Sequence, residues 1–494
     1  MRSALGPAAA LLAGVAQTFS FAPFEAWWLQ IAALAVLAHA AREARQARAA
    51  LLGWLFGTGW LVSGLWWLYI RMHSYGGMAA WLAALAVLAL AAALALYYAG
   101  ALALWARLRS GAPFGDALRF AACWLLAELA RATLFTGFPW IASGYAHSVG
   151  PLAAWAPWAG VYGISALAAW LAFTVTALPR AMSGAARAAL LAVALLLLTA
   201  GFWLPRGFTQ PAGVLGVSLL QPAVAQDLKF DPARMDANLH ALVRQVEAAR
   251  GTLVVAPESV IPFTRAEIAP VVWARLAHPF EANERGLLIG LFTGNAQDGY
   301  VNSVVGVGGA RGEYLYGKRH LLPFGEFVPP GFRWFVDMLQ IPLGDQARGT
   351  SGAPFEIGGQ RVRPLICYED LFGEDIVASV VGPAPATIFA NVSNLAWFGT
   401  ALVQDQHLQF SQMRALEFER PVVRATNTGA TAVVDHRGRV TTRLPAAAAG
   451  TLDASVEGRI GETPYARWLA AFGLWPLALL ALALLLALVR RPVN

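Results

Sequence analysis

Long apolar stretches alternate with short polar loops over the first 204 residues of the chain and return near its end. A helix needs about 20 residues to cross the ~30 Å hydrocarbon core of a bilayer. The pattern therefore predicts about eight transmembrane helices, at residues 4–21, 25–41, 50–70, 78–106, 114–134, 159–179, 187–204 and 466–489. Residues 1–21 could instead be a signal peptide cleaved after Gly14-Val15-Ala16, and that alternative leaves the other spans unchanged.

The segment between the seventh and eighth spans has a different pattern, with short β-rich apolar runs between polar helices and Gly/Pro turns. Strands are predicted at 214–221, 252–257, 286–292, 302–308, 362–368, 386–392, 421–426 and 430–435, and helices at 231–250 and 405–419. Strands interleaved with helices over this length indicate an α/β domain. We therefore expect a transmembrane domain at 1–211, a globular domain at 212–456, and a last transmembrane helix with a tail at 457–494.

Arginines predict the orientation of the spans. They gather in every second loop, whereas the alternate loops hold almost none. The arginines are Arg2, Arg42, Arg45, Arg48, Arg107, Arg109, Arg119, Arg180, Arg187, Arg490 and Arg491. Positively charged loops remain in the cytoplasm. The globular domain is therefore expected outside, on the periplasmic side of a bacterial inner membrane.

Composition agrees with a membrane protein, since 58% of residues are hydrophobic and only 13% are charged, against roughly a quarter charged in soluble chains. The net charge of +7 comes mostly from the short loops, and no basic run interleaved with aromatics indicates nucleic-acid binding. The two cysteines, Cys123 in an apolar stretch and Cys367 in the globular segment, are not expected to form a disulfide. Cys367 is then either a buried apolar residue or a reactive thiol.

Three residues that could take part in catalysis stand at the ends of predicted strands: Glu258, Lys318 and Cys367. Ligand sites of α/β sheets lie beyond the carboxyl ends of strands, so the three side chains can converge there. A carboxylate can take the proton of a thiol, and an ammonium favours the thiolate and stabilises an oxyanion. A base, a nucleophile and an oxyanion stabiliser are the minimum set of groups for acyl transfer. Taken singly, a cysteine after an apolar strand is more often a buried apolar residue than a nucleophile, and a glutamate after Ala-Pro is usually a solvated strand end or a helix cap. The lysine is stronger evidence for a functional role, because Lys229 and Lys318 are the only lysines among 36 basic residues, and arginine cannot replace the compact charge of a lysine.

The residues around these positions form three blocks: Ala256-Pro-Glu-Ser259, Gly317-Lys-Arg-His-Leu-Leu-Pro-Phe-Gly-Glu-Phe-Val-Pro329 and Leu365-Ile-Cys-Tyr-Glu-Asp370. They resemble the catalytic blocks of the nitrilase (carbon–nitrogen hydrolase) superfamily, and most closely its membrane branch, the apolipoprotein N-acyltransferase family. Further similar blocks are Asn391-Val-Ser-Asn-Leu-Ala-Trp-Phe-Gly399, Gln406-His-Leu-Gln409, Met413-Arg-Ala-Leu-Glu417 and Arg424-Ala-Thr-Asn-Thr-Gly429. Together with seven spans before the domain and one after, the resemblance covers nearly the whole chain.

The resemblance implies a four-layer αββα sandwich, with Glu258 as general base, Lys318 as oxyanion stabiliser and Cys367 as nucleophile. It also implies roles for Glu326, Tyr368 and Glu369. In this family the cysteine takes a fatty acyl chain from a phospholipid, commonly phosphatidylethanolamine, as a thioester. The acyl chain then passes to the α-amino group of a diacylglyceryl-cysteine at the N-terminus of a lipoprotein. The resemblance implies no metal and no organic cofactor.

Two features bear on substrate binding. Many family members have Trp where this chain has Phe230, which keeps an apolar face and loses the indole N–H donor. Residues 327–343 are apolar and aromatic but too short and Pro-broken to span a bilayer. We predict an arm that dips into the membrane interface over the site, with anchors Phe332, Trp334, Phe335 and Met338. Ordinary core packing is the alternative.

Other functions remain open at this stage. A membrane-tethered amidase or nitrilase could use the same three residues with water as the acceptor. A transporter with a ligand-binding outer domain would need polar residues along its spans, where Glu128 and Arg131 are the main charged pair and could form an ion pair at i and i+3. His320 and His407 lack metal-ligand spacing and are expected to be hydrogen-bonded structural residues.

Overall fold

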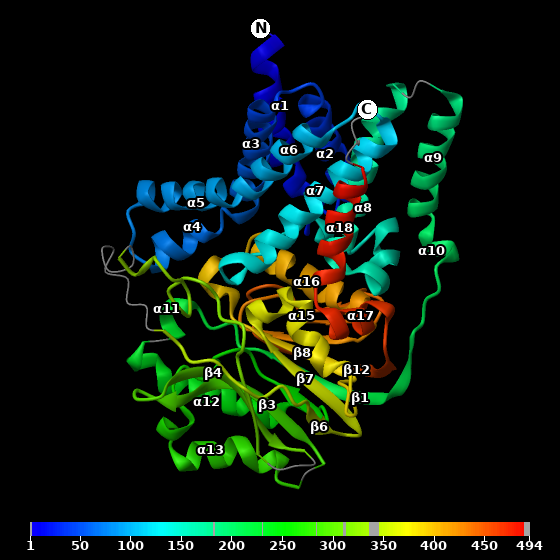
Figure 1. Ribbon diagram of the computed structural model, residues 1–494. Helices are drawn as coiled ribbons and strands as arrows, with labels where there is room; N and C mark the ends of the chain where they lie inside the picture. The colour runs from blue at the N-terminus through cyan, green and yellow to red at the C-terminus, as the bar shows by residue number, and fades with distance from the viewer. Residues whose placement is uncertain are drawn as a thin grey trace. The chain divides into compact units, whose positions relative to one another are not determined.

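A computed structural model describes residues 2–180, 183–229, 231–282, 284–309, 313–334 and 345–488. The chain divides into two compact units (Figure 1). One is helical and comprises residues 1–206 with 471–494, and the other, which contains the sheets, comprises residues 207–470.

The helical unit contains a helix in each stretch that the apolar pattern predicts as a span. Its helices are α1 (Arg2–Gln17), α2 (Trp27–Ala41), α3 (Gln46–Leu65), α4 (Leu68–Ile70), α5 (Ala80–Leu94), α6 (Leu96–Leu108), α7 (Pro113–Thr133), α8 (Ala156–Ala177), α9 (Gly184–Leu198), α10 (Ala200–Trp203) and α18 (Trp475–Ala487). Helix α17 (Pro464–Phe472) precedes α18.

Helix length and composition support fewer crossings than the apolar pattern predicts. Among the described residues, stretches 80–108 and 151–177 are long and apolar enough to cross a bilayer, and the bent pairs 46–75 and 464–487 raise the number to four. The apolar helices at 5–20, 27–41 and 184–198 are shorter. The count of eight spans therefore stays a prediction.

Close backbone packing joins α1 to α3. A Cβ atom at Gly14 would collide with the carbonyl of Phe56, and one at Gly59 would collide with the carbonyl of Leu11. Small residues allow this approach, which is a common way for apolar helices to associate without a hydrophobic driving force.

Helix α7 carries a buried ion pair of the kind that its spacing predicts. Arg131 Nη2 lies 3.1 Å from Glu128 Oε2, and both side chains are fully buried. Tyr98 Oη and the backbone N–H of Ser143 each donate to Glu128 Oε1 at 3.2 Å. Arg131 also donates to the carbonyl of Trp140 at 2.9 Å. Hydrogen bonds from neighbouring groups thus support both members of the pair, which offsets part of the cost of burying the two charges.

The second unit contains two six-stranded sheets. The first has the order β12 (Gly450–Gly461), β1 (Thr209–Gln221), β2 (Leu253–Val255), β3 (Gly286–Asn295), β4 (Gly299–Gly308) and β5 (Tyr314–Gly317). The second has the order β11 (Val440–Arg443), β10 (Ala432–Val434), β9 (Val422–Thr426), β8 (Ile388–Ser393), β7 (Gln360–Ile366) and β6 (Phe355–Ile357). In each sheet the inner trio, β1–β2–β3 or β7–β8–β9, is parallel and the outer pairings are antiparallel.

Helices cover the outer faces of both sheets, which pack on each other through β1, β4, β7 and β9. Helices α12 (Pro232–Ala248) and α13 (Pro270–Ala277) lie on the first sheet, and α16 (Val403–Phe418) packs on β9 and β10 of the second. Shorter helices are α11 (Gln226–Lys229) and α15 (Gly373–Ile376). The unit therefore has the two-sheet, nitrilase-like αββα fold that the sequence resemblance implies.

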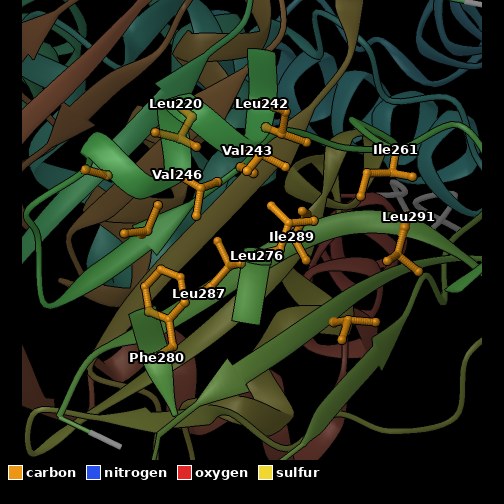
Figure 2. Packing of buried hydrophobic residues seen from close by; sticks show 14 of the residues in the cluster. Leu220, Leu242, Val243, Val246, Ile261, Leu276, Phe280, Leu287, Ile289 and Leu291 are labelled. Carbon is orange, nitrogen blue, oxygen red and sulfur yellow. The ribbon is translucent and has the colours of Figure 1, made fainter. Parts of the chain in front are cut away.

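The sequence of α12 determines both where this helix begins and which of its faces packs on the first sheet. Asp231 caps the helix by accepting from the backbone N–H of Ala233 at 2.9 Å, and Pro232 occupies the first turn. Apolar residues at helical spacing then face the sheet, and Figure 2 shows Leu242, Val243 and Val246 packed among buried residues of β1, β3 and α13.

All eight predicted strand regions of this unit form strands. The predicted ranges omitted β5, β6, β11 and β12, the last of which pairs with β1 along almost its whole length. It placed a plain loop at residues 445–450, and a turn there does connect β11 to β12.

Candidate active site

The ends of four strands bring polar side chains together in the sandwich. Glu258 follows β2, Lys318 follows β5, Cys367 directly follows β7, and Asn394 directly follows β8. Glu258, Lys318 and Cys367 are only 7%, 1% and 9% exposed, so their charges interact with little screening by water. Cys367 has φ +52°, a left-handed conformation that a non-glycine residue adopts rarely and that is typical of functional turns.

The carboxylate of Glu258 is held by donors on both oxygens. Asn302 Nδ2 donates to Oε1 at 2.8 Å, and Lys318 Nζ donates to the same oxygen at 3.5 Å. The backbone N–H of Asn394 donates to Oε2 at 2.9 Å. The carboxylate also makes a side-chain hydrogen bond with the thiol of Cys367. This geometry orients the carboxylate toward the sulfur atom.

The ammonium of Lys318 lies between two carboxylates. Its Nζ donates to Glu326 Oε1 at 2.8 Å, closer than its contact with Glu258. Glu326 is fixed in turn by Asn302 Nδ2 at 3.0 Å and by the backbone N–H of Leu322 at 2.8 Å. Burial alone would lower the pKa of Lys318, but the attraction of Glu326 and Glu258 outweighs it and raises that pKa. Lys318 is therefore a permanent cation beside Cys367.

The thiol of Cys367 is protonated in the resting site. Burial raises its pKa well above the ordinary value, and the neighbouring carboxylate of Glu258 raises it further, against the opposing effect of Lys318. From the sequence, the nearby ammonium was expected to favour the thiolate. The structure reverses the balance, because burial and two carboxylates outweigh one ammonium. The resting site thus holds a protonated Cys367 thiol next to its candidate base, Glu258.

Glu369 joins the cysteine turn to the lysine block. One of its oxygens accepts from the backbone N–H of Ile366 at 2.8 Å, just before Cys367. The other accepts from the backbone N–H of Arg319 at 2.8 Å, just after Lys318. Tyr316 Oη donates to both oxygens at 2.8 Å. This buried carboxylate therefore fixes the spacing between the two catalytic candidates.

Glu369→Gln is expected to lower the free energy of unfolding by about 2–3 kcal/mol, because an amide nitrogen would face donors that now bind a carboxylate oxygen. Thermal unfolding of the purified protein in detergent measures the loss. Glu457→Gln is the matched control, since Glu457 is a half-exposed carboxylate on β12, and it should change stability by less than about 0.5 kcal/mol. Equal effects of the two substitutions would contradict the anchoring role.

A second buried network lies behind the cysteine turn. Arg424 Nη1 lies 2.9 Å from Asp370 Oδ2, and Arg424 Nη2 donates to His407 Nδ1 at 2.7 Å. Asn391 Nδ2 donates to the carbonyl of Cys367 at 3.4 Å. His320 Nδ1 lies 2.7 Å from Asp375 Oδ2. Both histidines are thus hydrogen-bonded, as predicted. Among the described residues, no three or more His, Cys, Asp or Glu side chains are grouped as metal ligands.

The remaining predicted residues have different outcomes. Tyr368 is buried, with its ring near Phe372 at 5.1 Å and His320 at 5.7 Å. Trp334 is 64% exposed. Phe230, Phe335 and Met338 lie outside the described residues. The sequence analysis missed Asn302 and Asn394, whose amide and backbone groups hold Glu258.

Comparison with known proteins relates both units to one family. A family model described as apolipoprotein N-acyltransferase N-terminal domain matches residues 13–174, and one described as carbon–nitrogen hydrolase matches residues 217–465. Proteins named apolipoprotein N-acyltransferase from Verminephrobacter eiseniae and Ralstonia nicotianae are 48% and 47% identical to this chain. Those alignments cover 94% and 93% of this chain and 92% and 89% of the relatives.

Among solved structures, a CN-hydrolase superfamily protein from Xanthomonas campestris is 18% identical, with a TM-score of 0.38, over 54% of this chain and 97% of that one. The family assignment comes from the sequence relatives, which align along nearly the whole chain at high identity. The chain belongs to the apolipoprotein N-acyltransferase family.

Proposed function

We propose that this protein is a phospholipid:apolipoprotein N-acyltransferase that works through a thioester on Cys367, the final step of lipoprotein maturation. The observation that carries the proposal is the buried contact of a protonated thiol with the Glu258 carboxylate, beside the permanent cation of Lys318. These groups supply nucleophile, base and oxyanion stabiliser, the minimum set for acyl transfer.

The first half-reaction charges the enzyme. Glu258 takes the proton of Cys367 Sγ as the sulfur attacks the ester carbonyl carbon of a phospholipid, and the developing oxyanion is stabilised by Lys318. Collapse of the tetrahedral intermediate breaks the ester C–O bond. Glu258 returns its proton to the departing oxygen, so a lysophospholipid leaves and a fatty acyl thioester remains. Phosphatidylethanolamine is the proposed donor.

The second half-reaction transfers the chain. The α-amino group of a diacylglyceryl-cysteine, at the N-terminus of the apolipoprotein, attacks the thioester carbonyl. Glu258 takes a proton from the attacking nitrogen, the C–S bond breaks, and the proton passes to the departing sulfur. The amide and the free thiol result, and the same base serves both steps. Burial of the three residues keeps water from competing with the amine.

The substrates explain the membrane-rich sequence. Both are amphiphiles, so the site should open at the surface of a bilayer. We assign the apolar stretches to eight spans that anchor the catalytic unit on the periplasmic side of a bacterial inner membrane, with residues 1–211 as the main anchor, 212–456 as the catalytic domain and 457–494 as the last span and tail. The positive loops support this orientation.

The described part of the predicted arm supports contact with lipid. Phe332 and Trp334 are 45% and 64% exposed, and large aromatic side chains with this exposure favour membrane interfaces over core packing. Replacing both with Ser is expected to slow acylation of Cys367 from phospholipid vesicles by about tenfold, because two interfacial anchors are lost. Val271→Ser is the matched control, since Val271 is 69% exposed on α13. An unchanged rate in the double variant would exclude a role for the arm.

Intact-protein mass spectrometry tests the proposed function. After incubation with phosphatidylethanolamine vesicles, wild type should gain a fatty-acyl mass that hydroxylamine removes, and a diacylated lipopeptide should discharge it. Cys367→Ser should gain no hydroxylamine-labile mass. Absence of an adduct on folded wild type would contradict the proposal. Release of free fatty acid or ammonia without a lipopeptide would instead favour the amidase alternative.

A further inference from the structure

Helix α11 (Gln226–Lys229, Figure 1) places two polar side chains inside the catalytic unit. Gln226 and Lys229 lie three residues apart, on one face of the helix, and are only 2% and 5% exposed. Burial of an ammonium is costly unless partners compensate it. Lys229 is also one of only two lysines in the chain, and the mechanism above uses only the other.

The two side chains of α11 reach residues that flank the general base. Lys229 Nζ donates to Ser259 Oγ at 3.1 Å, and Ser259 directly follows Glu258 with φ +42°. Gln226 Oε1 accepts from Asn394 Nδ2 at 3.0 Å, and the backbone N–H of Asn394 binds the carboxylate of Glu258. One short helix therefore fixes the turn that carries the base and the donor that orients it.

The carboxylates that act on the thiol of Cys367 outnumber the ammonium groups that do. Glu258 and Glu326 both act on the thiol, while Lys318 is the one ammonium that does so. Lys229 attracts Glu258 electrostatically. With Lys229 charged, two ammonium groups attract Glu258, and without it only Lys318 does among the lysines.

We propose that Lys229 is a positioning residue for the general base, which holds the Ser259 turn and supplies a second positive charge that attracts the carboxylate of Glu258. The inference rests on the proposed function, in which Glu258 accepts the proton of Cys367. Lys229 acts through Glu258 and Ser259 and takes no part in bond making.

The surroundings of Lys229 make its charge sensitive to pH. Burial lowers its pKa to about 7, against the attraction of Glu258, which raises it. A small cavity beside Lys229 is lined from the end of β1, from α12, from residues 260–263 and by Asn427. Of the described lining residues, Lys229 is the only charged one. Lys229 is thus mostly charged below pH 7, about half charged near pH 7, and mostly neutral above it.

The test measures the rate of Cys367 acylation from phosphatidylethanolamine vesicles between pH 5 and 9, under single-turnover conditions with saturating donor. Lys229→Gln keeps a donor for Ser259 and removes the charge, so the acidic limb of the rate profile should move to higher pH by about half a unit to one unit. Lys229→Met should show the same shift with a further three- to tenfold loss of rate at all pH values. Lys229→Arg keeps the charge and should retain the wild-type limb.

Met235→Leu, in the same cavity lining, is the matched control and should leave the limb unmoved. Thermal unfolding checks that each variant is folded, and Lys229→Gln decides the matter if Lys229→Met does not fold. The inference would be overturned if the acidic limb of Lys229→Gln lay at the same pH as that of wild type, or if Lys229→Arg shifted it as far as Lys229→Gln does. Either result would leave the proposed function intact. Absence of acylation in wild type itself would overturn both.

Discussion

Glu258→Gln is expected to slow acylation of Cys367 by about 10³-fold at neutral pH, since general-base catalysis is typically worth 10²–10⁴-fold. The amide cannot take the thiol proton. It also cannot accept from all the donors that now bind the carboxylate, because Asn302 and Lys318 point at one oxygen and the backbone of Asn394 points at the other.

The pH dependence of the residual rate identifies the reason for the loss. Burial and Glu258 raise the pKa of the Cys367 thiol, and burial persists in the variant. Without the base only the small thiolate fraction reacts, and that fraction rises about tenfold per pH unit below the pKa. The residual rate of Glu258→Gln should therefore climb with pH between 6 and 9, whereas wild type levels off.

Intact-protein mass spectrometry with quenched time points gives both rates, and thermal unfolding checks that the variant is folded. A folded Glu258→Gln protein that acylates within tenfold of wild type at pH 7 would show that another group accepts the proton.

The convergence of Glu258, Lys318 and Cys367 could be predicted because each follows an apolar strand, and ligand sites of α/β sheets lie beyond the ends of strands. The sequence did not reveal that β2 and β5 belong to one sheet and β7 to the other, so that packing of the two sheets brings the three residues together. Asn302 and Asn394 gave no such signal. Asn302 lies within β4, where its amide resembles that of any polar strand residue, and Asn394 contributes a backbone N–H that every residue except proline has. Hydrogen-bond donors of this kind can be identified only once the fold shows that they lie next to Glu258.

The strands that were predicted and the strands that were missed differ in their burial. Strands such as β2 and β8 are buried along their whole length and read as continuous apolar runs. Strand β12 lies at a sheet edge, where exposed Asp453 and Glu457 alternate with buried positions and the buried position 459 is an arginine. Strands β5, β6 and β11 are edge strands of four, three and four residues, too short to show an alternating hydrophobic pattern.

The protonation state of Cys367 could not be predicted from the sequence, because it also depends on how the fold surrounds the residue. Motif spacing reveals which charges come near a thiol, and it placed a cation there correctly. It does not reveal how deeply the thiol is buried or that Glu326 adds a second carboxylate. In the helical unit, by contrast, the i and i+3 spacing of Glu128 and Arg131 was enough to predict their ion pair, because helix geometry alone brings such residues together.

Lys318→Met is expected to reduce acylation by at least 10²–10³-fold, the usual cost of losing one oxyanion-stabilising donor. The same substitution leaves Glu258 and Glu326 facing each other without the ammonium that now bonds to both. Removing one partner from a buried ionic cluster destabilises a protein by about 3–5 kcal/mol. The variant should therefore lose both activity and stability, and either loss could produce the other.

A double variant separates the two effects. Lys318→Met with Glu326→Gln removes one carboxylate along with the cation, so most of the lost stability should return in thermal unfolding. Acylation should stay low, because no ammonium remains to stabilise the oxyanion. If activity recovered together with stability, Lys318 would be a structural counter-ion of Glu258 and Glu326. Continued inactivity of the stable double variant would instead require that the lysine acts on the reacting acyl group, as an oxyanion stabiliser must.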